Sequence, residues 1–304
     1  GRQAYIKLLS RFDLTLDQAK LLYDADNRDT KGIEHSDSDF VENPYLFYEV
    51  TRQLPRELQV SVETIDRGVF PADIVRNSAP LPSPSALKSG LDGRRVRALT
   101  ISRLEQHATL GHTLEPRRTV LSEIREMAID PKCEVTSDIM DVVEDENFGD
   151  AIARIRLPDE SFAYQLRRLS DYTALIRRTV EKRLKAAKHQ VTADWERILE
   201  EEDLLGPVKP GDEQEERARI EKVAALKVIA GSRCSVLIGS AGTGKTTLLR
   251  ALAKEPEIAK GGILLLAPTG KARVRMEEGI GKGKFPAKTI AQLLFRGGRY
   301  DPTG

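Results

Sequence analysis

Apolar residues recur at intervals of three and four over much of the N-terminal two-thirds of the chain, the spacing of amphipathic helices. Residues 1–78 are predicted to form short helices, interrupted by a polar loop over residues 24–39. The further helices predicted in this way lie at residues 45–50, 93–107, 115–127, 137–144 and 161–190. The pattern therefore predicts a mostly helical N-terminal region.

Short apolar runs at residues 235–238 and 263–266 predict buried strands in the C-terminal third. A helix predicted at residues 245–253 separates them, so the three elements form a βαβ unit of a parallel sheet. A further strand is possible at residues 151–157. Because two strands are too few for a stable sheet, we expect the C-terminal part to be loosely held or to borrow partners.

Breaker-rich and acidic segments suggest where the chain divides. Residues 79–84 form a proline-rich connector, and residues 199–211 combine an acidic run with two Gly/Pro pairs. Asp212 then caps a helix to about residue 230, with Glu215 as its capping-box partner. The predicted domains are a helical region at 1–130, a small helical or winged-helix-like unit with a long basic helix at 131–198, a linker at 199–211, and an incomplete nucleotide-binding domain at 212–304.

Composition narrows the class of protein without naming a partner. Charged residues make up 31% of the chain, above the usual value of about 25%, which fits a solvated, helix-rich protein. The net charge of +1 gives no indication of nucleic-acid binding. The two cysteines lack disulfide or metal spacing, and no apolar run of about 18 residues or signal peptide occurs, so we expect a cytoplasmic protein with no membrane span. The first residue is not Met, and the chain stops inside an expected domain, so we expect a fragment of a longer protein.

The strongest chemical motif is the run Gly239-Ser240-Ala241-Gly242-Thr243-Gly244-Lys245-Thr246, between a predicted strand and a predicted helix. Glycines let the backbone curl so that its N–H groups and the positive end of the next helix surround phosphate oxygens. Lys245 supplies a cation to the β- and γ-phosphates, and Thr246 supplies a hydroxyl to Mg²⁺. The sequence therefore predicts ATP and Mg²⁺ as cofactors, bound by residues 239–247 including Thr247, with Lys245 and Thr246 as the catalytic pair.

A second polar segment, residues 267–271, follows the predicted strand at 263–266. It places Pro268 and Thr269 at the carboxyl end of a parallel strand, where α/β sheets bind ligands. Both are also ordinary residues of a capped turn, and that simpler interpretation stays open.

The C-terminal motifs together resemble a known family. The run VLIGSAGTGKTTLLRAL, then ILLLAPTGKARVRM, then KTIAQLL resembles the first motor domain of RecD-like DNA helicases, of superfamily one and the 5′→3′ class. The resemblance implies a RecA-like P-loop fold and contacts with single-stranded DNA at Pro268, Thr269, Lys271 and Thr289. Ala291 stands where the family commonly has His.

The family also often has a glutamine that reads adenine. Gln214 lies far from the loop for this role, and Arg219 or Glu221 could replace it, so the adenine reader is not assigned.

The N-terminal part resembles the helical region that precedes the motor in longer RecD-like proteins. The segments that carry this resemblance are FDLTLDQAKLL, ENPYLFYEV, GHTLEPRRTVL and LRRLSDYTALIRRTVEKRL. In the family the first two are helix-hairpin-helix-like, and such units present a glycine-rich turn to DNA. Phe12-Asp13-Leu14 lacks those glycines, so a packing or scaffold role is at least as well supported as DNA binding.

Two other features have simple explanations. One face of the long helix carries many Arg and Lys side chains, which favours a solvated face partly paired with Asp171 and Glu181. Its two Arg-Arg pairs keep contact with nucleic-acid phosphates open as the alternative. The four histidines, including His112, show no ligand spacing, so no metal site built on histidine is expected.

The overall prediction is a mixed α and α/β protein: a mostly helical N-terminal region followed by a truncated RecA-like P-loop parallel sheet. The predicted function is part of an ATP-dependent DNA helicase that acts on single-stranded DNA and duplex junctions, with no further subunit identified. No strand ending in Asp-Glu follows Thr246, so this chain alone is not expected to turn over ATP efficiently. The alternatives are a P-loop ATPase switch for assembly and a non-enzymatic scaffold.

Overall fold

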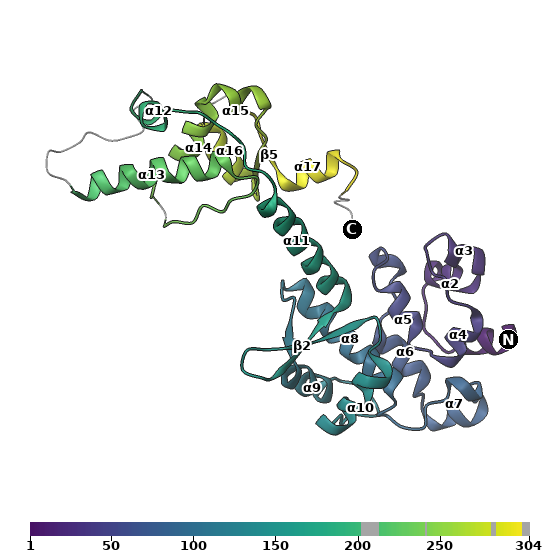
Figure 1. The fold of residues 1–304 in the computed structure, drawn as a ribbon. Helices are drawn as coiled ribbons and strands as arrows, with labels where there is room; N and C mark the ends of the chain where they lie inside the picture. The colour runs from purple at the N-terminus through teal and green to yellow at the C-terminus, as the bar shows by residue number, and fades with distance from the viewer. Residues whose placement is uncertain (202–212, 241, 281–283, 300–304) are drawn as a thin grey trace. The chain divides into compact units, whose positions relative to one another are not determined.

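The computed structural model describes residues 1–201, 213–240, 242–280 and 284–299. The chain divides into two compact units, Gly1–Ala174 and Leu175–Gly304. Helices dominate both units, and each unit contains one small sheet (Figure 1). The mostly helical N-terminal region predicted from the sequence is confirmed at this coarse level.

The first unit begins with short helices. They are α1 (Arg2–Leu9), α2 (Leu16–Tyr23), α3 (Ala25–Asp29), α4 (Asp37–Glu42), α5 (Leu46–Thr51), α6 (Val62–Val69) and α7 (Asp73–Ser78), with 3₁₀ turns η1 (Arg56–Leu58) and η2 (Ser83–Ser85). The predicted loop over residues 24–39 is wrong, because α3 and the start of α4 lie within it. Asp24 accepts a hydrogen bond from the Asp26 amide, and Ser36 and Asp39 form a capping box, so polar side chains start two short helices there.

Aromatic side chains form the centre of this helical cluster. The rings of Phe40 and Phe47 stack with their centroids 4.4 Å apart, and Phe12 meets Phe47 edge-on at 5.2 Å. A Cβ at Gly68 would lie 2.5 Å from the Phe12 ring, so only glycine allows this approach. Phe12, which follows α1, is therefore a packing residue, in agreement with one of the two roles considered from the sequence.

Residues 93–166 follow the element order of a winged helix. Their elements are α8 (Gly93–Thr109), β1 (Glu115–Pro116), α9 (Arg117–Glu126), α10 (Ser137–Asn147), β2 (Ile152–Arg156) and β3 (Phe162–Leu166). The three strands form an antiparallel sheet in the order β1-β3-β2. Its core is continuous with that of the preceding helices, since buried residues from Tyr5 to Leu166 belong to one cluster.

The long helix predicted at residues 161–190 is wrong at both ends. Residues 162–166 are strand β3, and α11 covers only Arg167–Lys185. Phe162 and Leu166 are four residues apart, a spacing that also fits the alternation of a strand. Pairing with β2 at five positions, from Ile152↔Leu166 to Arg156↔Phe162, decides for the strand.

A buried ion pair joins α6 to α8 in this unit. The Arg95 guanidinium donates to both carboxylate oxygens of Asp66 at 2.7 Å, and the Tyr45 hydroxyl donates to the same carboxylate at 2.5 Å. Arg95 and Asp66 are 0% and 2% exposed. Arg95 also donates to the carbonyls of Gly90 and Pro131, so all the charge that is buried here is hydrogen-bonded.

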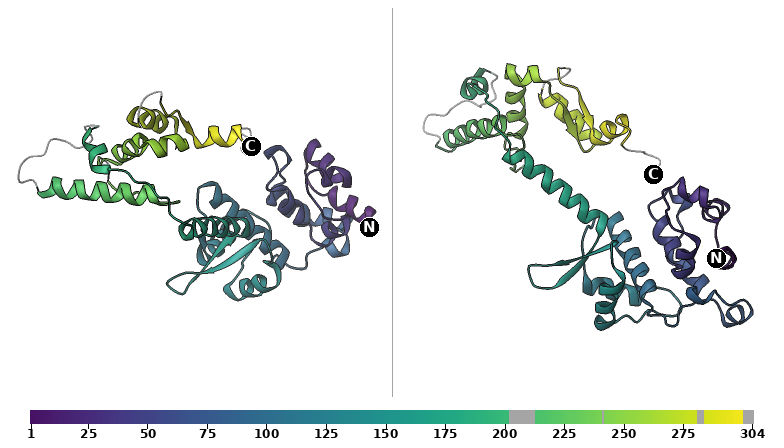
Figure 2. Two further views of the ribbon diagram at one scale, coloured as in Figure 1. Left: turned by 45° about the horizontal axis from the view of Figure 1, so that its top comes forward. Right: turned by 45° about the vertical axis from the view of Figure 1, so that its right-hand side comes forward.

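The second unit contains the C-terminal part of α11 and the elements that follow. They are α12 (Trp195–Glu201), α13 (Glu213–Gly231), α14 (Lys245–Lys254), α15 (Pro256–Gly261), β4 (Leu265–Ala267), α16 (Gly270–Ile280), β5 (Ala287–Thr289) and α17 (Ile290–Arg296). Helices α12, α13 and α14 lie against one another (Figure 2). Trp195, Leu226 and Leu248 form the small core between them. Leu265 and Ile280 belong to a second core around the sheet. Asp212 and most of the predicted linker lie outside the described residues.

The sheet of this unit is parallel, as predicted, but its strands are not the predicted pair. The βαβ unit is β4–α16–β5, with Leu265 opposite Ala287 and Ala267 opposite Thr289. Residues 235–238, predicted as a buried strand, form no strand, and Val236 and Ile238 are 82% and 88% exposed. An apolar run becomes a strand only beside a hydrogen-bonding neighbour, and no described strand pairs with residues 235–238. The RecA-like sheet is therefore matched only in part.

Candidate functional site: the phosphate-binding loop and the strand edge

The glycine-rich loop has the backbone conformation that its sequence requires. Gly242 and Gly244 have φ angles of +84° and +82°, in the left-handed region that side chains disfavour. A Cβ at Gly239 would lie 2.7 Å from Thr243 Oγ1, so this glycine also permits a close approach inside the loop. Ala241 lies outside the described residues. The described glycines thus each meet a distinct geometric requirement of one tight turn.

Lys245 points back into this loop. Its Nζ donates to the carbonyl oxygens of Gly239 and Ser240 at 2.6 and 2.7 Å. Thr243 Oγ1 also donates to the Ser240 carbonyl at 3.0 Å, which closes the turn from the other side. The ammonium group is therefore held in the concave part of the loop, beside the first turn of α14.

Helix α14 begins with free backbone donors. It covers Lys245–Lys254, and its N-cap residue Gly244 supplies no side-chain hydrogen bond. The first N–H groups of a helix have no partner inside the helix, so the amides of Lys245, Thr246 and Thr247 face the loop as donors. Their partial positive charge and the adjacent ammonium both favour a phosphate group. The arrangement fits a nucleoside triphosphate.

The side chain of Thr246 packs against a different helix. A Cβ added at Gly279 in α16 would overlap the methyl group of Thr246, so these two positions are in close contact. Arg250 Nε donates to the Gly279 carbonyl at 3.0 Å and holds α14 and α16 together one turn further on. This contact fixes the side chain that the sequence predicts to bind Mg²⁺.

One basic residue near the loop was missed by the sequence analysis. Lys222 of α13 brings its Cε to 3.8 Å from the position of a Cβ on Gly244, at the start of α14. The described residues offer it no ion-pair partner. Its neighbour Glu221 is exposed, and Arg219 lies 3.5 Å from Glu215, so neither takes this place. The helical period could have identified Lys222, because it shares a face of α13 with the buried Leu226.

The two segments predicted to contact DNA lie at one edge of the small sheet. Pro268 and Thr269 come directly after β4, and Thr289 is the last residue of β5, opposite Ala267. Because β4 and β5 are parallel, these residues and the exposed Lys271 gather at the carboxyl edge. Thr269 and Thr289 also cap α16 and α17 by accepting from the amides of Ala272 and Gln292 at 3.2 and 3.1 Å. Thr269 and Thr289 therefore cap helices whether or not they also contact DNA.

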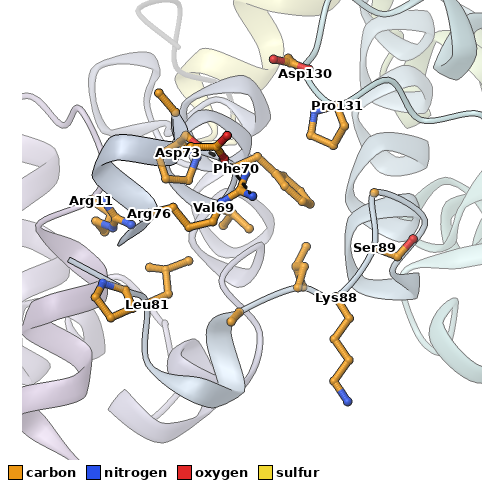
Figure 3. Close-up of a pocket in the computed structure, with 16 residues that line it drawn as sticks. Arg11, Val69, Phe70, Asp73, Arg76, Leu81, Lys88, Ser89, Asp130 and Pro131 are labelled. Carbon is orange, nitrogen blue, oxygen red and sulfur yellow. Dashed lines mark hydrogen bonds and ion pairs between the residues drawn. The ribbon is translucent and has the colours of Figure 1, made fainter. Parts of the chain in front are cut away.

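A cavity in the first unit has no such chemistry. It encloses about 730 Å³ beside α6 and α7 (Figure 3). Arg76 is paired with Asp73 at 3.3 Å, and Nε and Nη2 of Arg11 are buried without a hydrogen-bond partner. None of the described lining residues is a histidine or a cysteine. The walls mix both signs of charge with apolar side chains and suggest no reaction.

Other potential sites are explained by local contacts. Within the described residues, no group of three or more His, Cys, Asp or Glu is arranged to hold a metal ion. His107 contacts Glu123 at 2.9 Å, and His112 lies 3.8 Å from Glu115. Burial raises the pKa of the Cys133 thiol to about 11, so it stays protonated and unreactive at neutral pH. No described helix has the length and apolar character needed to cross a membrane.

Comparison with known proteins identifies the class of the second unit. Residues 220–301 match the model of a family described as AAA domain, a match that includes the loop, α14, α16 and β5. Together with the loop geometry, this match supports a domain of the P-loop ATPase type in these residues.

Two curated proteins are similar to parts of this chain. The ATP-dependent RecD2 DNA helicase of Deinococcus radiodurans is 40% identical over 84 residues, which cover 28% of this chain and 11% of the helicase. An uncharacterized protein of Methanocaldococcus jannaschii is 22% identical over 215 residues, 66% of this chain and 18% of that protein. The chain thus spans less than a fifth of the length of either relative. Over part of its length, the chain is therefore similar to a helicase.

Proposed function

We propose that this chain is part of an ATP-dependent DNA helicase that couples ATP hydrolysis to 5′→3′ movement along single-stranded DNA. The observation that carries the proposal is the position of Lys245. Its ammonium lies inside a loop whose glycines have left-handed φ angles, at the open N-terminus of α14. The 40% identity to the RecD2 helicase supports a motor over other P-loop ATPases.

In this proposal the loop binds the triphosphate of Mg-ATP. Lys245 exchanges its two carbonyl partners for phosphate oxygens, and the free amides of α14 bind the same phosphates. Thr246 presents its hydroxyl to Mg²⁺, which neutralises charge on the transferred phosphoryl group. Lys222 adds a second cation at the start of α14. The residues present therefore hold and orient the nucleotide.

The DNA strand is proposed to cross the carboxyl edge of β4 and β5. Pro268, Thr269, Lys271 and Thr289 contact it there. The strand would share this part of the second unit with the nucleotide loop, because α14 packs against α16, which begins right after Thr269. A shift of α16 that follows ATP hydrolysis would then move the DNA contacts at Thr269 and Lys271.

The first unit is not assigned to DNA. Helix α10 occupies the third helical position of the winged-helix order, the position that enters a DNA groove in many such folds. It carries five acidic residues, Asp138, Asp141, Glu144, Asp145 and Glu146. Glu144 is buried and paired with Arg117 and Arg154. The exposed acids Asp138, Asp145 and Glu146 repel phosphates, so this helix favours a structural role.

The proposal is tested by ATPase and unwinding assays on the protein at its full natural length. Duplexes with a 5′ or a 3′ single-stranded tail report direction, and Lys245→Ala removes the loop cation. We expect ATPase stimulated by single-stranded DNA, unwinding from 5′ tails, and loss of both in Lys245→Ala. Strong ATPase that is indifferent to DNA would instead identify an ATPase switch, and failure to bind nucleotide would identify a scaffold.

A further inference from the structure

A basic cavity lies between the C-terminal part of α11 and the segment that follows α13. It encloses about 610 Å³ and is lined by Leu175, Arg178, Thr179, Lys182, Arg183, Ala186 and Arg233. Four of these seven side chains are cationic and none is acidic. All of them belong to the second unit.

Two hydrogen bonds hold the two walls of this cavity together. Arg233 Nε donates to the Ala187 carbonyl at 2.8 Å, and the His189 amide donates to the Gly231 carbonyl at 2.9 Å. They bring Arg233, which is distant in sequence, beside the last turns of α11. The concentration of positive charge is therefore produced by the fold and is not a property of one helix alone.

The positive charges in this cavity have no acidic partner among the described residues. No ion pair links Arg178, Lys182, Arg183 or Arg233 to a carboxylate within the described residues. Glu181 lies on α11 but does not line the cavity. All four cations are exposed, so water and salt weaken their mutual repulsion, but four cations that share a cavity with no acidic side chain still attract an anion. This arrangement therefore points to an anionic ligand.

The helix dipole of α11 explains the position of only some of the four cations in this cavity. Cations in the last turn of a helix interact favourably with its dipole, and Lys182, Arg183 and Lys185 lie in the last turn of α11. Arg178 lies one turn further back, and Arg233 comes from another segment. The dipole therefore does not account for their convergence on one cavity.

We propose that this cavity binds the phosphodiester backbone of a single nucleic-acid strand. Arg178 and Lys182 are four residues apart and lie one above the other along α11, about 6 Å apart along the axis at 1.5 Å per residue. That separation is close to the spacing of successive phosphates in an extended strand. Arg183 and Arg233 face the same strand from the sides, and the apolar Leu175 offers a surface for a base.

The site differs from the proposed strand path at β4 and β5 and does not depend on ATP hydrolysis. A strand held here would be anchored to residues 231–233, which lead through the exposed 235–238 segment to Gly239. The cavity thus supplies a second point of attachment for a strand on the same unit as the nucleotide loop.

The test compares two triple variants that remove the same charge, one from the cavity-lining positions of α11 and one from α11 and the residues just after it. Arg178→Ala/Lys182→Ala/Arg183→Ala empties the cavity of its α11 cations, and Arg177→Ala/Lys185→Ala/Lys188→Ala removes cations that do not line it. Alanine is the best helix former, so both variants are expected to keep α11, which circular dichroism checks. Arg233 is left intact because it also holds Ala187.

Binding is measured by fluorescence anisotropy with a labelled oligothymidylate at several salt concentrations. We expect the cavity variant to bind at least about tenfold more weakly at low salt, with a salt slope smaller by about 2, and the control to change little. Equal losses in both variants, or no loss in either, would overturn the proposal.

Two further measurements distinguish strand binding in this cavity from binding of small anions and from binding at the nucleotide loop. Inorganic phosphate is added as a competitor: displacement of the strand at millimolar phosphate would show a site for small anions and would contradict a strand site. Lys245→Ala is expected to keep full strand affinity. Failure of the motor proposal and failure of this one are therefore distinguishable.

Discussion

The methyl group of Thr246 packs directly against Gly279, a contact that joins the first turn of α14 to the last turn of α16. A methyl side chain at position 279 would overlap it. We expect Gly279→Ala to displace Thr246 and to weaken Mg-ATP binding by about tenfold, or about 1.4 kcal/mol. Titration of a fluorescent ATP analogue with and without Mg²⁺ measures the effect, which should be larger with the ion.

Gly261→Ala is the matched control for this substitution. Gly261 ends α15, and a Cβ added there meets no atom within 4 Å. Its nucleotide affinity should remain that of the unaltered protein. Equal Mg-ATP affinity in Gly279→Ala and Gly261→Ala would show that the position of Thr246 has no influence on the bound ion.

Lys222 is expected to strengthen nucleotide binding through its charge. Its Cε lies near Gly244, close to the open amides of α14, so Lys222→Ala should lower ATP affinity by roughly threefold to tenfold. The loss should shrink as salt is added, because the interaction is between partly exposed charges. Isothermal titration at two salt concentrations measures both.

Lys227→Ala provides the comparison for Lys222→Ala. Lys227 is exposed on the same helix, and it is one turn and one residue further along. A comparable loss of affinity in Lys227→Ala would show that any positive charge on α13 acts at a distance, and the specific role of Lys222 would be abandoned.

Much of the second unit could be predicted from the sequence, and the reasons are local. Glycines at 242 and 244 and the good helix formers after Lys245 define the loop and α14 without help from the rest of the fold. Lys222 was missed because its approach to the loop depends on how α13 packs against α14. The helical period places Lys222 on the same face as Leu226, but it does not give the distance from Lys222 to the loop.

The sheets show the opposite case. Residues 235–238 have the composition of a buried strand, and residues 162–166 have spacing compatible with a helix, yet both predictions are wrong. Strand formation is decided by the neighbour across the hydrogen bonds, which is distant in sequence. Ile152 to Arg156 provides that neighbour for β3, and no described segment provides it for Val236 and Ile238.

Lys271 is expected to contribute to strand binding at the edge of β4 and β5. It is exposed at the start of α16, next to Thr269. Lys271→Ala should weaken binding of single-stranded DNA at all sequences alike and lower the salt slope by roughly 0.7 to 1, as loss of one phosphate contact does. Anisotropy titrations with two oligonucleotides of different sequence measure this.

Lys260→Ala removes an exposed charge from α15 and serves as the control. Its salt slope should not change. If Lys271→Ala and Lys260→Ala show the same salt dependence of DNA binding, Lys271 makes no phosphate contact. The residues at the edge of β4 and β5 then only cap helices.

The buried pair of Arg95 and Asp66 is expected to dominate the stability of the first unit. Asp66→Asn leaves the Arg95 charge in a site that is 0% exposed, without its counter-ion. Loss of one partner of a buried pair costs about 3–5 kcal/mol, so the unfolding free energy should fall by that order. Asp73→Asn, which alters the exposed pair with Arg76, should cost no more than about 1 kcal/mol. Urea unfolding of both variants tests the difference.

Alkaline pH should also destabilise the first unit, through its buried tyrosines. Burial raises the pKa of Tyr5 to about 12, and burial is also the main cause of the raised pKa values of Tyr48 and Tyr164. An unfolded tyrosine has a pKa of about 10, so as the pH rises past 10 the unfolded chain loses protons that the folded chain keeps. The stability of the fold is therefore complete below about pH 10 and declines between about pH 10 and 12.

The steepness of this decline depends on how many tyrosines stay protonated in the fold. Each contributes at most about 1.4 kcal/mol per pH unit in that window. The Tyr5 hydroxyl donates to the Leu22 carbonyl and accepts from Arg28 at 3.1 Å, so it remains part of the folded core while protonated. Tyr5→Phe should lower stability at neutral pH but flatten its loss at high pH. Urea unfolding followed from about pH 8 to pH 11 measures both quantities, and a decline equally steep in both proteins would rule out Tyr5 as one of the groups responsible.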